Sequence, residues 1–204
     1  MRKTLIALII LTLSFGVVGC TSDKEETASN SNEVVTQEES KEEKKRSSDE
    51  MYELYTSKLE EVEKFFKENN IDFKEDQSNK NKKYDGTVSI SYENSDDNAK
   101  YSVAGYGIAF NSDGEIKSIS AGITLNVIDE EMKTKKFKFE DTEFYKLHNI
   151  LISDINNTDE INNKVNEAYK GLTSLDKVEI ENGKIRESLL LGDNRLVYTI
   201  IINP

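Results

Sequence analysis

The sequence predicts an α+β domain: an antiparallel sheet, or sheets, with an N-terminal helix and a central helix pair packed on one face. Apolar residues recur at steps of three and four in three segments, as on one side of a helix. In other segments they alternate with polar residues, as in half-buried strands. The segments run helix, strands, two helices, strands, and short connections favour antiparallel pairing with the helices on one side.

The first helix is expected to begin beside Ser47 and Glu50, whose S-x-x-E spacing is that of a capping box. An apolar stripe then continues to about Glu68 at helical spacing. Its members are Met51, Leu54, Tyr55, Leu59, Val62, Phe65 and Phe66. The domain therefore opens with one amphipathic helix.

The region that follows has the two-residue period of strands. The strands are expected at residues 88–92, 101–110 and 116–127. The turn-forming residues 111–114, Asn-Ser-Asp-Gly, predict a hairpin between the last two. Phe137 and Phe139 are expected to form a short fourth strand.

The period then becomes helical again, with Asp141 or Thr142 capping one helix and Thr158 capping the next. The apolar stripes hold Phe144, Leu147 and Leu151 in the first helix and Ile161, Val165, Ala168, Tyr169 and Leu172 in the second. Three closing strands are expected at residues 178–181, 185–191 and 196–202. The dipeptide Asn182-Gly183 predicts a hairpin between the first two of them.

The N-terminus has the layout of a secretory leader. Basic Arg2 and Lys3 precede an apolar run, and Gly19 precedes Cys20. The apolar run has roughly 14 residues, fewer than the ~20 that a membrane-spanning helix needs. A cleaved signal over residues 1–19 is therefore favoured over a retained span.

Residues 17–20, Val-Val-Gly-Cys, resemble the lipobox of bacterial lipoproteins, with Val17 where Leu is commonest. The resemblance covers the leader alone. It implies that the Cys20 thiol is joined to diacylglycerol and that two acyl chains hold the protein on the extracytoplasmic side of the cell membrane. Cys20 is the only cysteine, so no internal disulfide is possible. An incidental thiol beside an ordinary cleavage site is the alternative.

Composition divides the mature chain into a tether and a domain. Residues 20–48 are polar and charged apart from Val34-Val35, which predicts a disordered tether, whereas residues 49–204 can form a single domain. The formal net charge of −12 disfavours nucleic acid as a partner. Abundant Lys, Asn, Ile and Glu are typical of an AT-rich genome, which favours a Gram-positive cell surface.

Few residues suggest chemistry, and no catalytic residue, metal ligand or cofactor is assigned. His148 is the only histidine, which excludes His-rich zinc sites, and we expect it to be partly buried with a local hydrogen-bond partner. Two stretches of alternating oxygen ligands, 111–115 and 154–158, do not complete a calcium loop and are attributed to turns and helix caps. Tyr84 and Tyr101 are candidate interface residues, although tyrosine is also a good strand former.

These observations favour a non-enzymatic binding or accessory module for a protein or cell-envelope partner. Two other classes stay open. A cell-envelope hydrolase would use a pair of carboxylates, which a chain with 39 acids could supply at many positions. A small solute receptor is disfavoured by size, because such receptors usually close two lobes about a hinge.

Overall fold

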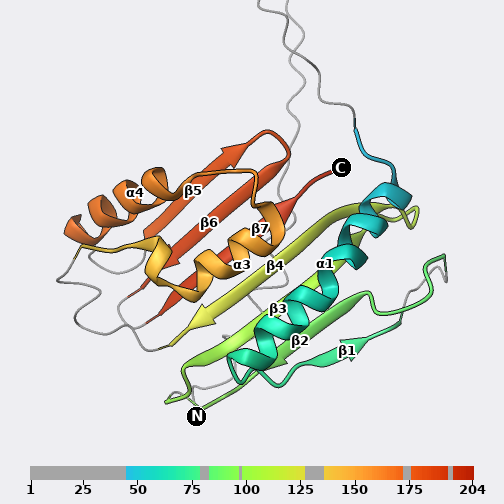
Figure 1. Cartoon of the computed structure of the whole chain (residues 1–204), viewed down its shortest axis with the longest axis horizontal. Helices are drawn as coiled ribbons and strands as arrows, with labels where there is room; N and C mark the ends of the chain where they lie inside the picture. Colours follow the sequence, from blue (N-terminus) through green and yellow to red (C-terminus); the bar gives the residue numbers. More distant parts are fainter. Residues whose placement is uncertain (1–44, 79–82, 97, 127–135, 172–175, 193–194) are drawn as a thin grey trace, which may run out of the picture. The chain divides into compact units, whose positions relative to one another are not determined.

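The computed structural model describes residues 45–78, 83–96, 98–126, 136–171, 176–192 and 195–204 (Figure 1). Within them, seven strands form one antiparallel sheet in the order β1-β2-β3-β4-β7-β6-β5. The strands are β1 (Lys74–Asp76), β2 (Ser89–Glu93), β3 (Tyr101–Phe110), β4 (Ile116–Leu125), β5 (Asp176–Asn182), β6 (Ile185–Leu191) and β7 (Leu196–Ile202). The helices are α1 (Ser48–Glu68), α3 (Glu143–Ile152), α4 (Thr158–Gly171) and the 3-10 turn η1 (Phe139–Asp141).

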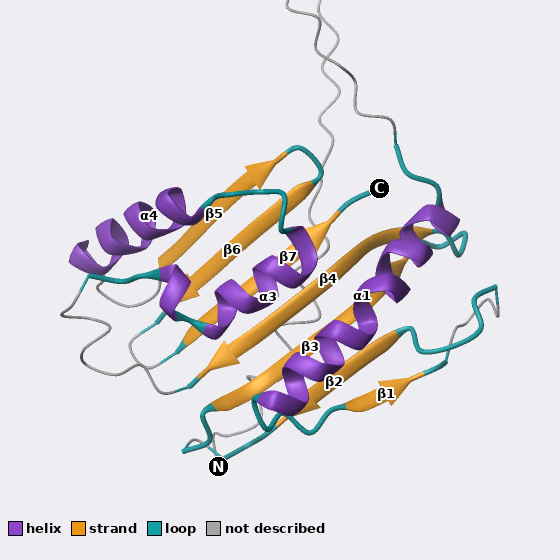
Figure 2. Ribbon diagram, in the orientation of Figure 1, coloured by secondary structure: helices purple, strands orange, loops and turns teal. Residues whose placement is uncertain are grey.

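Helices α1 and α3 lie over one face of this sheet, and α4 lies beyond its β5 edge (Figure 2). The predicted α+β class is therefore confirmed, and the strands form one sheet rather than two. Apolar residues from the helices and from the helix-facing side of the strands form one continuous core.

Helix α1 begins at the predicted capping box. The Ser47 hydroxyl accepts a hydrogen bond from the Glu50 N–H at 3.2 Å, and the Ser47 N–H donates to Glu50 Oε2 at 2.6 Å. The apolar stripe packs on the sheet, where Tyr55 and Tyr106 stack with ring centroids 4.6 Å apart. The Tyr106 hydroxyl donates to the Tyr55 carbonyl at 2.9 Å, so β3 is fixed to the helix by both packing and a buried hydrogen bond.

The sheet consists of two meanders that meet at its centre. Strands β1 to β4 follow α1 along the chain, and β5 to β7 follow α3 and α4. The meanders join where β4 pairs antiparallel with β7, with Ile123 opposite Tyr198. Strands β1 and β5 are consequently the two edges of the sheet.

The predicted strand at Phe137 and Phe139 is wrong. Both side chains are buried, but the backbone there leads into η1 and pairs with helix α4 instead of the sheet. The Asn166 side chain accepts from the Phe137 N–H at 2.7 Å and donates to the Phe137 carbonyl at 3.0 Å, and Asn162 Oδ1 accepts from the Phe139 N–H at 2.6 Å. Side-chain amides thus supply the hydrogen bonds that a neighbouring strand would otherwise supply.

Candidate functional site

Edge strand β5 borders the candidate site. It forms a hairpin with β6 in which Asn182 lies opposite Ile185 across a turn at Gly183 and Lys184. In an antiparallel pair, alternate residues direct their N–H and C=O groups to the partner strand and the others direct them away. Asn182, in the pair that closes the turn, directs its N–H and C=O groups to β6, as do the other even-numbered residues of β5. The odd-numbered residues of β5 direct their N–H and C=O groups away from β6. These residues are Lys177, Glu179 and Glu181.

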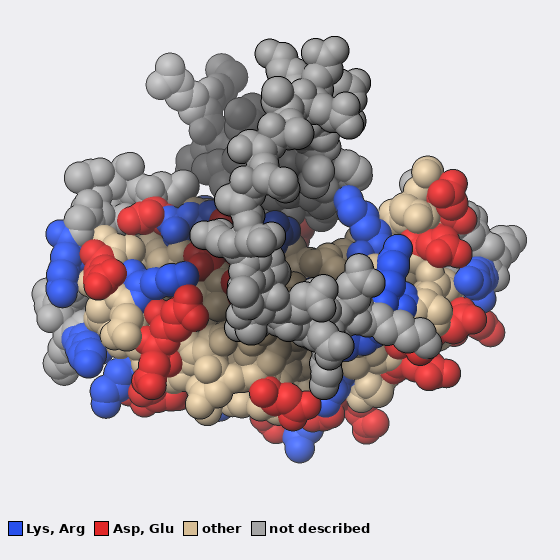
Figure 3. Space-filling view, turned by 90° about the horizontal axis from the view of Figure 1, so that it is seen from above, with Lys and Arg blue, Asp and Glu red and all other residues tan. Residues whose placement is uncertain are grey.

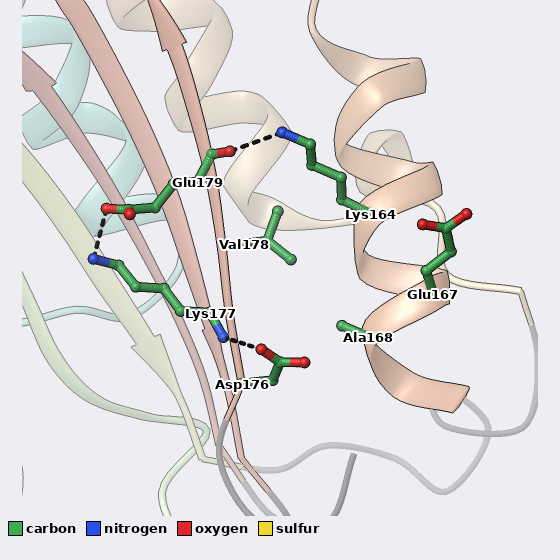
Figure 4. Close-up of a pocket in the computed structure, with 7 residues that line it drawn as sticks. All are labelled: Lys164, Glu167, Ala168, Asp176, Lys177, Val178 and Glu179. Atoms are coloured by element: carbon green, nitrogen blue, oxygen red, sulfur yellow. Dashed lines mark hydrogen bonds and ion pairs between the residues drawn. The ribbon is translucent and has the colours of Figure 1, made fainter. Parts of the chain in front are cut away.

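Side chains engage part of this exposed backbone. Lys164 of α4 donates from Nζ to the Glu179 carbonyl at 2.9 Å, and the Lys177 N–H donates to Asp176 Oδ1 at 2.8 Å (Figure 4). The Glu179 N–H and the backbone of Glu181 make no hydrogen bond to the described residues. An edge with unpaired backbone groups can pair with another chain, and charged side chains are a common way to restrict this.

Helix α4 forms the other wall of the site. It lies outside β5, on the side away from β6 (Figures 1 and 4). Its apolar residues Ile161 and Val165 are buried in the core together with Val178 and Ile180 of β5. Between helix and edge strand lies an open cavity of about 420 Å³, which we call the α4–β5 groove. The groove is lined by Lys164, Glu167, Ala168, Asp176, Lys177, Val178 and Glu179.

The groove is small, and its lining is mostly charged with a minor apolar part. Ala168 and Val178 supply the apolar contact surface. Lys177 pairs with Glu179 at 2.6 Å, and Lys164 pairs with Glu160 one turn earlier in α4 at 2.8 Å. Over the surface seen in Figure 3, acidic and basic side chains are interspersed. The groove can therefore offer backbone groups, a small apolar contact and nearby charges of both signs.

His148 belongs to a different place, in the interior beneath α3. Its Nδ1 lies 2.8 Å from Glu187 Oε1 of β6, and its Nε2 lies 2.9 Å from the Ile155 carbonyl. The Tyr198 hydroxyl donates to the same Glu187 oxygen, and Asn157 Nδ2 donates to Glu187 Oε2 at 2.8 Å. His148 and Glu187 are 2% and 1% exposed, so this buried His148–Glu187 cluster is closed to a substrate.

The prediction for His148 is thus only partly right. It is more deeply buried than expected, and besides the local partner, the Ile155 carbonyl seven residues away, it has a second partner, Glu187, which is 39 residues away in the chain. One signal of this was present in the sequence. Glu187 occupies the apolar row of a strand, with Leu189 two positions later. An acid on the core face of a strand needs a buried partner.

The predicted interface residues are separated and mostly buried. Tyr84 is 8% exposed and stacks on Tyr52 near the start of α1, at 4.5 Å between ring centroids. Tyr101 is 5% exposed, and its hydroxyl donates to Asn69 Oδ1 at 3.4 Å beyond the end of the same helix. Burial raises the pKa of Tyr101. The structure brings neither ring to the α4–β5 groove, and Cys20 lies outside the described residues.

The stretches of alternating oxygen ligands are a turn and a helix start, as predicted. Asn111 Oδ1 accepts from the N–H groups of Asp113 and Glu115, at 3.0 and 2.8 Å. Asn156 Oδ1 accepts from the N–H of Thr158, where α4 begins, at 3.4 Å. Among the described residues, no cluster of three or more His, Cys, Asp or Glu side chains is arranged to hold a metal ion.

Comparison of the chain with protein-family models, curated proteins and solved structures found no match. No helix in the described part of the chain has the length and apolarity to span a bilayer.

The sequence alone would not have revealed the α4–β5 groove. Its residues come from a helix and from a strand whose edge position depends on the pairing of all seven strands.

Proposed function

We propose that this protein is an extracytoplasmic lipoprotein, anchored to the cell membrane through Cys20, that acts as a binding or accessory module for a protein or cell-envelope partner. The observation that carries the binding role is the α4–β5 groove, where a sheet edge, two apolar side chains and several charged side chains meet on the surface. The tether expected over residues 20–48, whose last residue is the first of α1 in the structure, would hold this groove away from the bilayer.

Binding suits the groove better than catalysis, because its polar groups are arranged to hold backbone and one another. Asp176 accepts from a backbone N–H, and Glu179 is paired with Lys177. General acid or base catalysis instead needs a titrating group within hydrogen-bond reach of a substrate proton. His148, which titrates near neutral pH in its ordinary state, lies in the closed interior.

The anchor is tested by the intact mass of the protein extracted from membranes, beside a Cys20→Ala variant fractionated in parallel. A chain that begins at a diacylated Cys20, and a variant that leaves the membrane fraction, are the expected results. An unmodified chain that still begins at Met1 would contradict the lipoprotein assignment.

The binding role is tested by a photo-crosslinking residue at Glu167 in the groove, with the same residue at exposed Lys146 of α3 as a matched control. Intact cells are irradiated, and the adducts are compared by mass spectrometry. A defined adduct from position 167 that position 146 does not give is expected. Equal or absent adducts at both positions would rule out the groove as the contact surface.

A further inference from the structure

The exposed backbone of β5 is the part of the groove that identifies a class of partner. We propose that an extended segment of a partner protein adds to β5 as an eighth strand, between β5 and the overhanging helix α4. This inference rests on the proposed binding function and identifies the kind of partner as an extended peptide segment. The outward N–H and C=O groups of Lys177, Glu179 and Glu181 would pair with the added strand, as in other sheets that are extended by a peptide.

The contacts that now engage this edge are easily displaced. The Lys164 ammonium and the Asp176 carboxylate each satisfy one outward backbone group, in the way an incoming strand would. The Lys164 side chain is 44% exposed and also forms an ion pair with Glu160. The Lys164 ammonium therefore still has an ionic partner after its hydrogen bond to the Glu179 carbonyl is broken. Contacts of exposed charged side chains contribute little free energy. An incoming backbone can therefore replace them.

The position of α4 favours a single extended segment over a second copy of this chain. In a dimer formed by two antiparallel β5 strands, a two-fold axis would relate the subunits. Each α4 lies outside its own β5 and would project over the partner's β5, so the two helices would have to share a space only two strands wide, which is too narrow for them (Figure 1). One strand without a helix avoids this conflict.

Charge and size describe the segment further. Side chains of an added strand alternate between its two faces. Those on the helix side meet Ala168 and Val178 between the charged residues Lys164, Glu167 and Asp176, and those directly over Ala168 and Val178 should be small and apolar. Those on the other side lie across from Lys177, Glu179 and Glu181, and opposite charges across a strand pair are favourable. Two acids against one base, in a chain of net charge −12, favour a basic segment.

A suitable probe is a synthetic nine-residue peptide of alternating lysine and valine, added to the chain from residue 20 onward carrying Cys20→Ala. Binding is measured by calorimetry. In the antiparallel, charge-matched arrangement that we propose, the lysines lie on the same face as Glu179, and their own backbone N–H groups point to β5. N-methylation of the lysine amides should therefore weaken binding roughly tenfold or more, whereas N-methylation of the valine amides should change it little.

Variants test the protein side of the same contact. Lys164→Ala removes a competing donor and should tighten peptide binding several-fold, while Lys146→Ala on α3 should not. Glu179→Pro removes an outward N–H without touching the ladder to β6 and should weaken binding roughly tenfold or more. Glu179→Gln keeps that N–H and should lose less. Thermal unfolding identifies a variant that fails to fold, in which case the two methylated peptides still decide the question.

Equal binding of both methylated peptides would mean adsorption by charge alone and would overturn the proposal. No binding of the parent peptide would overturn it too. Sedimentation of the peptide-free protein tests whether a second copy of this chain pairs with β5. A dimer that Glu179→Pro dissociates would show that another subunit occupies the edge, contrary to the proposal. None of these outcomes bears on the anchor or on adducts at position 167, so the wider function stands or fails separately.

Discussion

His148 Nδ1 lies 2.8 Å from Glu187 Oε1 in the interior of the protein, and the other ring nitrogen faces the Ile155 carbonyl at 2.9 Å. Both nitrogens therefore face hydrogen-bond acceptors, an arrangement that only the protonated imidazole satisfies. Glu187 in turn accepts from three donors, His148, Tyr198 and Asn157. The geometry indicates a buried ion pair that ties the α3–α4 connection to strands β6 and β7.

The ion pair makes stability depend on pH. Burial lowers the pKa of His148, but the hydrogen bond and charge of Glu187 and the bond to Ile155 outweigh it, so the pKa lies above its ordinary value of 6.5. The stabilisation from protonated His148 is thus complete below pH 6.5 and is lost as the pH rises through the folded-state pKa. Urea unfolding should show decreasing stability from neutral to alkaline pH. A His148→Gln variant should lack that slope, and a flat profile in the parent protein would contradict the assignment.

The stabilisation from Glu187 depends on pH in the opposite direction to that from His148. Burial raises the pKa of Glu187, but the bonds from His148, Tyr198 and Asn157 outweigh it and hold the pKa below its ordinary value of 4.5. Its stabilisation is present above pH 4.5 and is lost as the pH falls through the folded-state pKa. The contribution of the pair should consequently be greatest between these two ordinary pKa values, which the same unfolding series at acid pH measures.

The losses of unfolding free energy on removing His148 and Glu187 should not be additive. Glu187→Leu leaves His148 without its carboxylate, and breaking a buried ion pair costs roughly 3–5 kcal/mol. The double variant His148→Leu/Glu187→Leu leaves neither charge, so its loss should be smaller than the sum of the two single losses. A double-mutant cycle of unfolding free energies measures this. Strict additivity would show that the two side chains do not stabilise each other.

Asn166→Ala should destabilise the domain by roughly 1–3 kcal/mol, because it leaves the N–H and C=O of Phe137 without their side-chain partner. Asn163→Ala is the matched control, since Asn163 is exposed on the same helix and should change stability by less than about 0.5 kcal/mol. Equal unfolding free energies for the two variants would mean that the amide pairing contributes nothing measurable.

Gly107→Ala should loosen the contact between β2 and β3. A Cβ at this position would lie 2.7 Å from Ser89 Cβ, whereas a Cβ at Gly105 would meet its nearest neighbour, the Ile90 carbonyl, at an ordinary 3.5 Å. Overpacking of this kind typically costs about 1–3 kcal/mol. Gly107→Ala should therefore lower the melting temperature more than Gly105→Ala, and adding Ser89→Gly should restore part of the loss. The reverse order of the glycine variants would refute the steric argument.

Local signals predicted most of the elements well. The capping box at Ser47 and the end of α1 at Glu68 are as predicted, because both depend on residues within the helix itself. The strands Tyr101–Phe110, Ile185–Leu191 and Leu196–Ile202 have the predicted bounds. The last two alternate between a buried and a less buried face. Hairpins form at both predicted turns.

What sequence reasoning missed depends on contacts between distant residues. Strand β1 has three exposed residues and no apolar alternation, so only its pairing with β2 identifies it. Phe137 and Phe139 alternate like a strand, but asparagines of α4 hold their backbone. The α4–β5 groove likewise exists only because β5 is at an edge. Alternation reports which side chains are buried; it does not report what the backbone pairs with.

The pairing of β4 with β7 also has a consequence for the order of events as the chain is made. Strand β7, the last strand in sequence, occupies the middle of the sheet and joins the two meanders. The N-terminal meander must wait, with the inner edge of β4 uncovered, until residues 196–202 have emerged, and contacts this distant in sequence form slowly. During that interval β4 is open to pairing with other chains, so this is the stage of synthesis at which a chaperone would protect the chain most.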